Sequence, residues 1–453
     1  MIFTILNKKL KPLCILGFLY FFLLNTVVAQ QGFFIESNKN SFTLKFELIN
    51  DLVIIPVEIN GVELSFLLDT GVDSTILFSI GDKDTVNLKN TETIYLRGLG
   101  KGEPIKAMKS SGNEVKIGLS RNKNLICYLV FDNPLSLSNR MGVPVHGIIG
   151  YDFFRDFVLE INYIKLELKA YNPNFFKYRR CTKCDDLPFT FIRNKPYVKI
   201  KGKIIDRTIP LNLLVDSGSG DAIWLFSNEE KGIGIPENNF PDFLGFGIGG
   251  SVYGLRSRVK EINLGKNILR EVTASFPDTI YFKGIETFSQ RNGSLGAQIL
   301  KRFLLTIDYP GKNMRLKPNK NFSEPFEYDM SGVVIAHDGF TIIKDIMRNP
   351  LALRQDDLNN TAAGNMVYKS TYDVKFSLEP EYKIVEVRPG SPAQLAGLQV
   401  GDIIMKINGR DAYKFSLTQI SHLLSSGEGK RINFLIERNG RELQVGFELK
   451  KVL

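Results

Sequence analysis

The feature that most constrains the fold of this chain is an internal repeat. Asp69-Thr70-Gly71 follows the apolar run 62–68, and Asp216-Ser217-Gly218 follows the apolar run 211–215. The two aspartates lie 147 residues apart, and the last glycines of segments 147–150 and 293–296 lie 146 residues apart. Because several independent features keep nearly one offset, the sequence predicts two copies of one β-rich unit.

The repeated aspartates predict a pair of carboxylates. A single Asp-Thr-Gly is typical of any strand that ends in a turn. Two such motifs at equivalent places predict a pseudo-twofold packing that brings Asp69 and Asp216 together, where they share one proton. One carboxyl then acts as a base on a water molecule while the other donates to a substrate carbonyl. Four residues are expected to support this dyad. Two carry hydroxyls that bond across the axis, Thr70 and Ser217, and two are glycines that let the chain turn, Gly71 and Gly218.

A glycine-rich stretch lies between each aspartate and its glycine partner, at 97–102 and 245–250. The second stretch matches GxGxxG, but nucleotide binding by that motif needs a helix directly after it. Residues 251–259 are instead typical of a strand, which favours a hairpin that approaches a ligand closely. The glycines predicted to contact substrate are Gly98, Gly100, Gly247 and Gly249.

These motifs resemble the two lobes of an aspartic peptidase, each lobe similar to one retropepsin subunit and both fused in tandem as in pepsin-like enzymes. The resemblance implies a mainly β fold with β-barrel lobes at 33–175 and 188–318, a catalytic dyad of Asp69 and Asp216, and glycine-rich hairpins that act as flaps. Asp73 falls where retropepsins place a substrate-binding aspartate, although no arginine follows Gly150. Val72 also departs from the family, which usually has Ser or Ala there.

The last third of the chain, 330–453, resembles a bacterial PDZ domain of α/β type with an insertion around 344–371. Residues 382–387 are typical of a strand, Ser391 and Pro392 of a helix start, and Gly397 of a helix end. The resemblance implies binding of a C-terminal peptide by strand addition. The predicted carboxylate-binding loop is Gly332, Val333 and Val334. An alternative is a PDZ-shaped domain that only packs on the lobes.

The N-terminus predicts export. Three lysines precede the apolar stretch 13–28, and Ala29 offers a cleavage site, a pattern typical of a secretory signal peptide over 1–29. An uncleaved anchor is the alternative, and the mature chain is expected to have no transmembrane span. Cys181 and Cys184 form a CxxC that suits a local disulfide or two free thiols, while Cys127 is expected in a core.

Composition excludes several other classes of function. The 453 residues carry a formal net charge of +10, but the basic residues are scattered, so no nucleic-acid partner is predicted. Three histidines, one to a region, and a single CxxC predict neither a metal site nor another cofactor. The sequence thus predicts an exported aspartic endopeptidase, in the periplasm, on the cell surface or secreted, that cleaves polypeptides. The alternatives are a non-catalytic peptide-binding protein of the same fold and a protease with one dedicated substrate.

Overall fold

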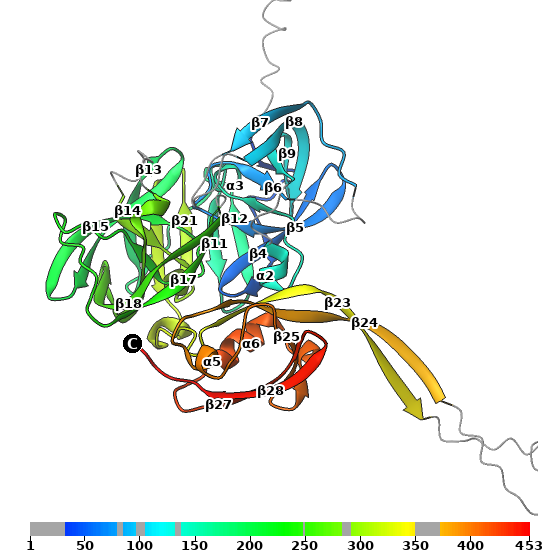
Figure 1. The fold of residues 1–453 in the computed structure, drawn as a ribbon. Helices are drawn as coiled ribbons and strands as arrows, with labels where there is room; N and C mark the ends of the chain where they lie inside the picture. Colours follow the sequence, from blue (N-terminus) through cyan, green and yellow to red (C-terminus); the bar gives the residue numbers. More distant parts are fainter. Residues whose placement is uncertain are drawn as a thin grey trace, which may run out of the picture.

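The computed structural model describes residues 32–78, 85–96, 105–131, 137–247, 250–282, 291–348 and 372–453. These residues fold mainly into β-strands, which confirms the predicted fold class. Figure 1 shows two β-rich lobes side by side and a C-terminal domain beneath both of them. The predicted signal peptide, 1–29, lies outside the described residues.

Lobe 1 is built on a sheet with the strand order β1-β9-β6-β10-β5-β4-β8-β7, in which β3 pairs with β4. Alternation along β5 directs Leu64, Phe66 and Leu68 into the core of the lobe. The elements of lobe 1 are β1 (Phe34–Ile35), β3 (Glu47–Ile49), β4 (Leu52–Ile59), β5 (Val62–Leu68), β6 (Thr75–Leu77), β7 (Thr91–Leu96), β8 (Ile105–Ile117), β9 (Ser120–Val130), α2 (Leu137–Met141), β10 (Gly147–Ile149) and α3 (Tyr151–Phe154).

Lobe 2 repeats this arrangement in the order β17-β18-β19-β16-β20-β15-β14-β13. In each lobe, the strand before the aspartate pairs in parallel with the strand of the glycine motif: β5 with β10, and β15 with β20. The elements of lobe 2 are β13 (Asp185–Ile192), β14 (Lys195–Ile204), β15 (Arg207–Val215), β16 (Ile223–Leu225), β17 (Asn239–Gly247), β18 (Gly250–Leu264), β19 (Asn267–Pro277), η1 (Thr279–Tyr281), β20 (Gly293–Leu295) and α4 (Ala297–Leu300).

A sheet shared by both lobes joins them. Its order is β2-β12-β11-β21-β22-β13, and β11 of lobe 1 pairs with β21 of lobe 2 along its whole length, from Val158↔Asp308 to Asn162↔Leu304. The cores of the two lobes are therefore continuous. The strands not yet given are β2 (Ser41–Lys45), β11 (Val158–Asn162), β12 (Glu167–Tyr171), β21 (Phe303–Asp308) and β22 (Asn313–Pro318), followed by η3 (Lys320–Ser323).

The C-terminal domain has a sheet of order β23-β24-β25-β27-β28, with β26 paired to β25. As predicted, Ser391 caps a helix that starts at Pro392. The first two strands extend beyond the domain as a long hairpin (Figure 1), and the part of the predicted insertion at 349–371 lies outside the described residues. The elements are β23 (Val333–Arg348), β24 (Tyr372–Val387), α5 (Pro392–Leu395), β25 (Ile403–Ile407), β26 (Arg410–Asp411), η5 (Ala412–Lys414), α6 (Leu417–Leu424), β27 (Arg431–Arg438) and β28 (Arg441–Glu448).

The cysteines of the described residues are in two different states. Cys181 and Cys184 form a disulfide, and Cys127 is free and fully buried in the core of lobe 1, as predicted. Among the residues that the structure describes, no helix has the length and hydropathy needed to cross a membrane.

Candidate active site

Asp69 and Asp216 occupy equivalent positions at the ends of buried strands. The backbone N–H of Asp69 donates to the carbonyl of Ile149 at 2.9 Å, and the N–H of Asp216 donates to the carbonyl of Leu295 at 2.9 Å. Each aspartate is thus fixed by the glycine motif of its own lobe. Asp69 is 7% exposed, and Asp216 is half-buried.

The neighbouring hydroxyls join the two lobes. The N–H of Thr70 donates to Oγ of Ser217, and the N–H of Ser217 donates to Oγ1 of Thr70, both at 3.0 Å. Each hydroxyl also donates to the strand of the opposite lobe: Thr70 to the carbonyl of Val215 at 2.7 Å, and Ser217 to that of Leu68 at 2.9 Å. These are the cross-axis bonds that the repeated hydroxyls predict. They are reciprocal and buried, so they hold the two aspartate loops in register.

The two glycines leave room for the carboxylates. A Cβ at position 71 would lie 2.8 Å from Oδ1 of Asp216, and a Cβ at position 218 would overlap the carboxylate of Asp69. Each glycine therefore lies against the carboxylate of the opposite lobe. The backbone N–H of Gly71 also donates to Oδ1 of Asp69 at 2.6 Å. The structure thus brings together all six residues predicted for the dyad and its support.

Burial and mutual repulsion alter the ionisation of the dyad. Burial, followed by the charge of Asp216, raises the pKa of Asp69 to about 7. Burial also raises the pKa of Asp216, but the positive charges of Arg291 and Lys195 oppose that rise. Near neutral pH this arrangement favours one proton shared by the two carboxyls.

The dyad lies in a cleft of about 900 Å³ between the lobes. Apolar side chains of lobe 1, including Leu67, Ile76 and Ile148, form one part of its wall. The charged side chains that line it are Asp69, Asp73, Asp216, Asp221, Arg140, Arg193, Lys195 and Arg291. The cleft therefore offers apolar surface together with a few polar groups near the dyad, as binding sites for small ligands and peptides do.

Comparisons with known proteins agree with this geometry. Residues 55–153 match the sequence model of the family described as "Aspartyl protease", and residues 383–438 match the family described as "PDZ domain". An aspartyl protease domain and a PDZ domain are joined in this chain.

The matched relatives cover only parts of the chain. It is 27% identical over 128 residues, 28% of its length, to the "Retrovirus-related Pol polyprotein from transposon 412" of Drosophila melanogaster. It is 38% identical over 64 residues, 14% of its length, to the human "26S proteasome non-ATPase regulatory subunit 9". The chain spans 10% and 29% of the lengths of these two proteins. A crystal structure of an aspartic proteinase from Irpex lacteus superposes with a TM-score of 0.38 at 12% identity, covering 63% of this chain and 99% of that one.

The predicted flap residues of the protease domain are described only in part. Gly98, Gly100 and Gly249 lie outside the described residues. Gly247 is the last residue of β17 and lines the cleft together with Phe246. The β17–β18 hairpin therefore borders the cleft, as expected of a flap. Asp73 also lines the cleft.

The predicted carboxylate-binding loop of the PDZ domain lies in a different cavity. Gly332, Val333 and Val334 line a space of about 610 Å³ between lobe 2 and the PDZ domain. The N–H of Gly332 already donates to the carboxylate of Asp329, and the N–H of Val333 donates to Oγ of Ser331. Burial raises the pKa of Asp329 to about 6. A carboxylate of the chain itself therefore uses the amide of Gly332, one of the three residues predicted to form the carboxylate-binding loop.

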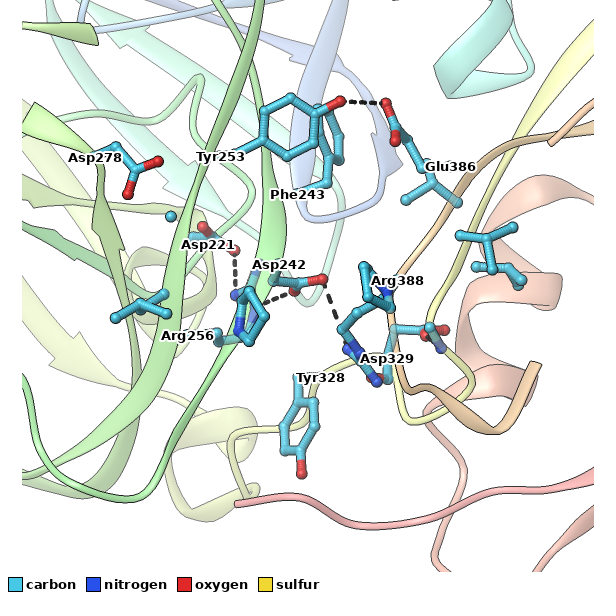
Figure 2. A pocket seen from close by; sticks show the side chains of 18 of the residues that line it. Asp221, Asp242, Phe243, Tyr253, Arg256, Asp278, Tyr328, Asp329, Glu386 and Arg388 are labelled. Carbon is cyan, nitrogen blue, oxygen red and sulfur yellow. Dashed lines mark hydrogen bonds and ion pairs between the residues drawn. The ribbon is translucent and has the colours of Figure 1, made fainter. Parts of the chain in front are cut away.

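Figure 2 shows how this cavity connects lobe 2 to the PDZ domain. Arg256 binds Asp221 at 2.9 Å and Asp242 at 2.7 Å, and Asp242 lies 3.6 Å from Arg388 of the PDZ domain. Burial disfavours the charge of Arg256, but the two carboxylates outweigh this effect and raise its pKa. The interface thus contains a buried chain of alternating charges.

The PDZ domain also contacts the β17–β18 hairpin of lobe 2, the predicted flap. The hydroxyl of Tyr253 donates to Glu386 at 2.8 Å, as Figure 2 shows. Phe240 of β17 belongs to the hydrophobic core of the PDZ domain, where its ring lies 5.6 Å from that of Tyr328. Because β17 and β18 form the hairpin that borders the cleft, the PDZ domain supports one wall of the candidate active site.

Lobe 1 contacts the PDZ domain through α2. This helix packs against β23 and reaches α6 (Figure 1). A Cβ at Gly142, just after α2, would lie 3.1 Å from Leu417 of α6. Arg140 of the same helix stacks on Phe246 of the flap hairpin, with 2.9 Å between its guanidinium carbon and the ring centre. One short helix therefore contacts both the PDZ domain and the flap.

Sequence reasoning missed the basic side chains around the dyad. Arg291 and Lys195 both act on Asp216, although they lie 75 and 21 residues away from it in the chain. Neither belongs to a motif. Arg291 lies two residues before segment 293–296, which repeats the lobe 1 pattern, and this position was the one signal that the sequence offered.

Proposed function

We propose that this protein is an aspartic endopeptidase in which Asp69 and Asp216 form the catalytic dyad. The observation that supports this proposal is the reciprocal geometry of the two loops. Each carboxylate follows a buried strand, each faces the glycine of the opposite loop, and both loops are joined by the Thr70 and Ser217 hydroxyls. A pair of strand ends that only turned the chain would need none of these cross-lobe contacts.

The charges around the dyad assign a different role to each carboxyl. Asp216, beside Arg291 and Lys195, is the base that removes a proton from the attacking water. Asp69 carries the shared proton and donates it to the carbonyl oxygen as the water oxygen bonds to the carbonyl carbon. In the second step the carbon–nitrogen bond breaks, the proton on Asp216 passes to the leaving nitrogen, and Asp69 recovers a proton from the hydroxyl of the collapsing intermediate.

Cleavage of an unstructured protein, with and without pepstatin, tests this proposal. Asp69→Asn and Asp216→Asn should each lower turnover at least about 100-fold, because each removes one proton-transfer group. The matched control is Asp206→Asn, on an exposed turn of lobe 2 far from the cleft lining. Near-normal turnover in either dyad variant would refute the shared-proton mechanism. Retained peptide binding without cleavage by the wild-type chain would favour a non-catalytic peptide-binding protein.

We also propose that the protein is exported after removal of residues 1–29. The basic, apolar and small residues at the N-terminus support this proposal. The Cys181–Cys184 disulfide is consistent with an oxidising compartment. N-terminal sequencing of protein from the extracytoplasmic fraction should begin just after Ala29. A mature chain that still starts at Met1 would contradict cleavage.

For the PDZ domain we propose binding of an extended peptide along the free edge of β23. Within the described residues, β23 pairs with β24 alone, so its other edge can accept a strand. Because α2 packs against β23 and reaches α6, the peptide must displace α2. Release of α2 would also withdraw Arg140 from Phe246 at the cleft.

Binding of a labelled hydrophobic peptide with a free C-terminal carboxylate tests this role. Two variants each remove one contact that holds lobe 1 in place. Arg140→Ala removes the contact with Phe246 of lobe 2, and Asn50→Ala removes the hydrogen bond with Thr418 of the PDZ domain. Both variants should bind the peptide more tightly than the wild type, whereas the exposed control Arg270→Ala should not differ from it. Unchanged binding in both variants would show that α2 does not compete for the groove. No binding by any variant would favour a domain that only packs on the lobes.

A further inference from the structure

Lys195 lies at the end of a hairpin that borders the cleft. The turn Arg193–Asn194, with φ values of 48° and 62°, joins β13 to β14, and Lys195 pairs with Ile192 directly beside it. Ile192, Arg193 and Lys195 all line the cleft that contains the dyad. The hairpin therefore presents a half-buried ammonium group to the space where a substrate would bind.

The ammonium group of Lys195 has no close counter-ion among the described residues. Its charge lowers the pKa of both Asp69 and Asp216, which places it near the two carboxylates. No ion pair or hydrogen bond joins it to either of them in the described part of the chain. A ligand carboxylate can therefore pair with this ammonium group without breaking an ion pair that the described residues already make.

The remaining charges of the cleft leave a positive surplus. The dyad carries one negative charge when it shares a proton, and Arg256 neutralises Asp221. Asp73 is then the one further acidic side chain in the described lining. The basic side chains there are four: Arg140, Arg193, Lys195 and Arg291. Arg140 stacks on Phe246, and Arg291 donates to the carbonyl of Gly293. Arg193 and Lys195 are thus the basic groups of the described lining that stay open to a ligand, and of these two Lys195 is the one whose charge acts on both carboxylates.

Lobe 1 has no equivalent of this lysine. Tyr197 of β14 pairs with Leu214, two residues before Asp216, just as Ile54 of β4 pairs with Leu67, two residues before Asp69. Two residues earlier on these strands stand Lys195 and Leu52. Lobe 2 therefore lines the cleft with an ammonium group at this position, whereas the equivalent Leu52 of lobe 1 is buried in a hydrophobic cluster and does not line the cleft.

From this geometry we propose that Lys195 is a specificity-determining residue that binds an acidic side chain of the substrate close to the scissile bond. The substrates are then peptides with Asp or Glu on the side of the bond that faces lobe 2. This inference rests on the proposed peptidase function. It also predicts that only one side of the scissile bond selects an acidic residue, because Lys195 lies on the lobe 2 side of the cleft.

Matched peptides test the proposal. Each peptide is internally quenched and C-terminally amidated, and carries Glu or Gln at one position on either side of the scissile bond. At one of these positions, the wild-type chain should cleave the Glu peptide with a kcat/KM at least about tenfold above that of the Gln peptide, the scale of a hydrogen bond to a charged group. Lys195→Met should abolish this preference, mainly through KM. The control Lys199→Met, exposed on the same strand and outside the cleft lining, should keep it.

Three outcomes would overturn the assignment. The first is an equal loss of kcat/KM on the Glu and Gln peptides in Lys195→Met, together with a shifted pH profile of cleavage. This result would mean that the lysine only alters the ionisation of the dyad. The second is a preference for Glu that survives in Lys195→Met. The third is a Lys195-dependent preference for a free C-terminus over the amide, which would make the ligand a chain end rather than a side chain.

Binding separates this proposal from the peptidase function. In the Asp69→Asn chain, the labelled Glu peptide should bind more tightly than the Gln peptide, and Lys195→Met added to that chain should remove the difference. Such a result in a protein whose wild type cleaves nothing would refute the peptidase function while supporting the Lys195 site. Cleavage without any difference in binding or kcat/KM would refute the site alone.

Discussion

The two lobes present their aspartates on matching backbones but surround them with different side chains. His146 in lobe 1 and Asn292 in lobe 2 make the same pair of backbone bonds, so the residues just before them, Val145 and Arg291, are structurally equivalent. Lobe 1 thus places Leu52, Ile54 and Val145 where lobe 2 places Lys195, Tyr197 and Arg291. A symmetric backbone therefore supports an asymmetric dyad, in which the lobe 2 carboxylate ionises more readily.

The lobes also differ in how their cleft walls are supported. Lobe 2 contributes Phe240 to the core of the PDZ domain and binds it through Asp242 and Tyr253. Lobe 1 contacts it through α2 and through Asn50, which bonds with Thr418. A PDZ domain that only tethered substrate would leave short-peptide cleavage intact after its removal. The contacts with the flap hairpin favour the opposite outcome.

Removal of the PDZ domain, which supports the lobe 2 side of the cleft, should have the largest effect on peptide cleavage. A chain that ends at Met330 keeps Tyr328 but loses the rest of the PDZ core into which Phe240 packs, and it loses Glu386, the partner of Tyr253, so the β17–β18 hairpin shifts. Short-peptide kcat/KM should fall by about 100-fold, the scale of a ~1 Å misplacement near the chemistry. Steady-state kinetics would measure the loss. Tyr253→Phe, which removes one hydrogen bond, is the graded control and should lose far less. Unchanged kinetics in the truncated chain would show that the PDZ domain does not support the cleft.

Substitution of the cross-axis hydroxyl should have the next largest effect. Thr70→Val leaves the N–H of Ser217 and the carbonyl of Val215 without their partner, at a cost of roughly 1–3 kcal/mol in unfolding free energy. Thr70→Ser should be nearly silent, because Ser217 already fills the equivalent position. Chemical denaturation and peptide cleavage, measured together, would check both expectations. Similar behaviour of the two variants would mean that the hydroxyl bonds contribute little.

Replacement of Arg291 should shift the pH profile. The positive charge of Arg291 opposes the burial that raises the pKa of Asp216, so Arg291→Met should raise that pKa further. Since Asp216 must be ionised to act as base, the acidic limb of kcat should move to higher pH by about one unit. Arg291→Lys, which keeps the charge, should shift it less. An unmoved acidic limb in the methionine variant would show that lobe 2 does not polarise the dyad.

The prediction with the smallest bearing on activity concerns stability. The pKa of Asp69 is raised from 3.8 to about 7, so the folded state binds this proton more tightly than the unfolded state does. The stability that Asp69 contributes is therefore complete below about pH 4 and is lost as the pH rises through 7. Asp69→Asn should accordingly gain thermal stability relative to the wild type at pH 8 but not at pH 4. A gain of equal size at both values would contradict the raised pKa.

The sequence predicted the symmetric part of the molecule better than the asymmetric part. Asp69, Asp216 and their hydroxyl neighbours recur at one offset, so the repeat itself indicates where they meet. Lys195 and Arg291 break the repeat, and only the folded sheet brings them to the dyad. The position of α2 against β23 was equally hidden, because a five-residue helix in lobe 1 carries no sign of a contact with a domain about 200 residues later.

The shared sheet between the lobes has a consequence for the order of folding. Strand β11 pairs with β12 on one side and with β21 on the other. Until β21 has been synthesised, the sheet ends at an open edge of β11 that runs from Val158 to Asn162. The chain must therefore make 146 further residues, from Asn162 to Asp308, before the whole of this edge is paired. Such long-range pairing is slow and leaves a template for wrong partners. Lobe 1 alone is thus expected to aggregate or pair with another copy, and the native protein matures only when lobe 2 docks.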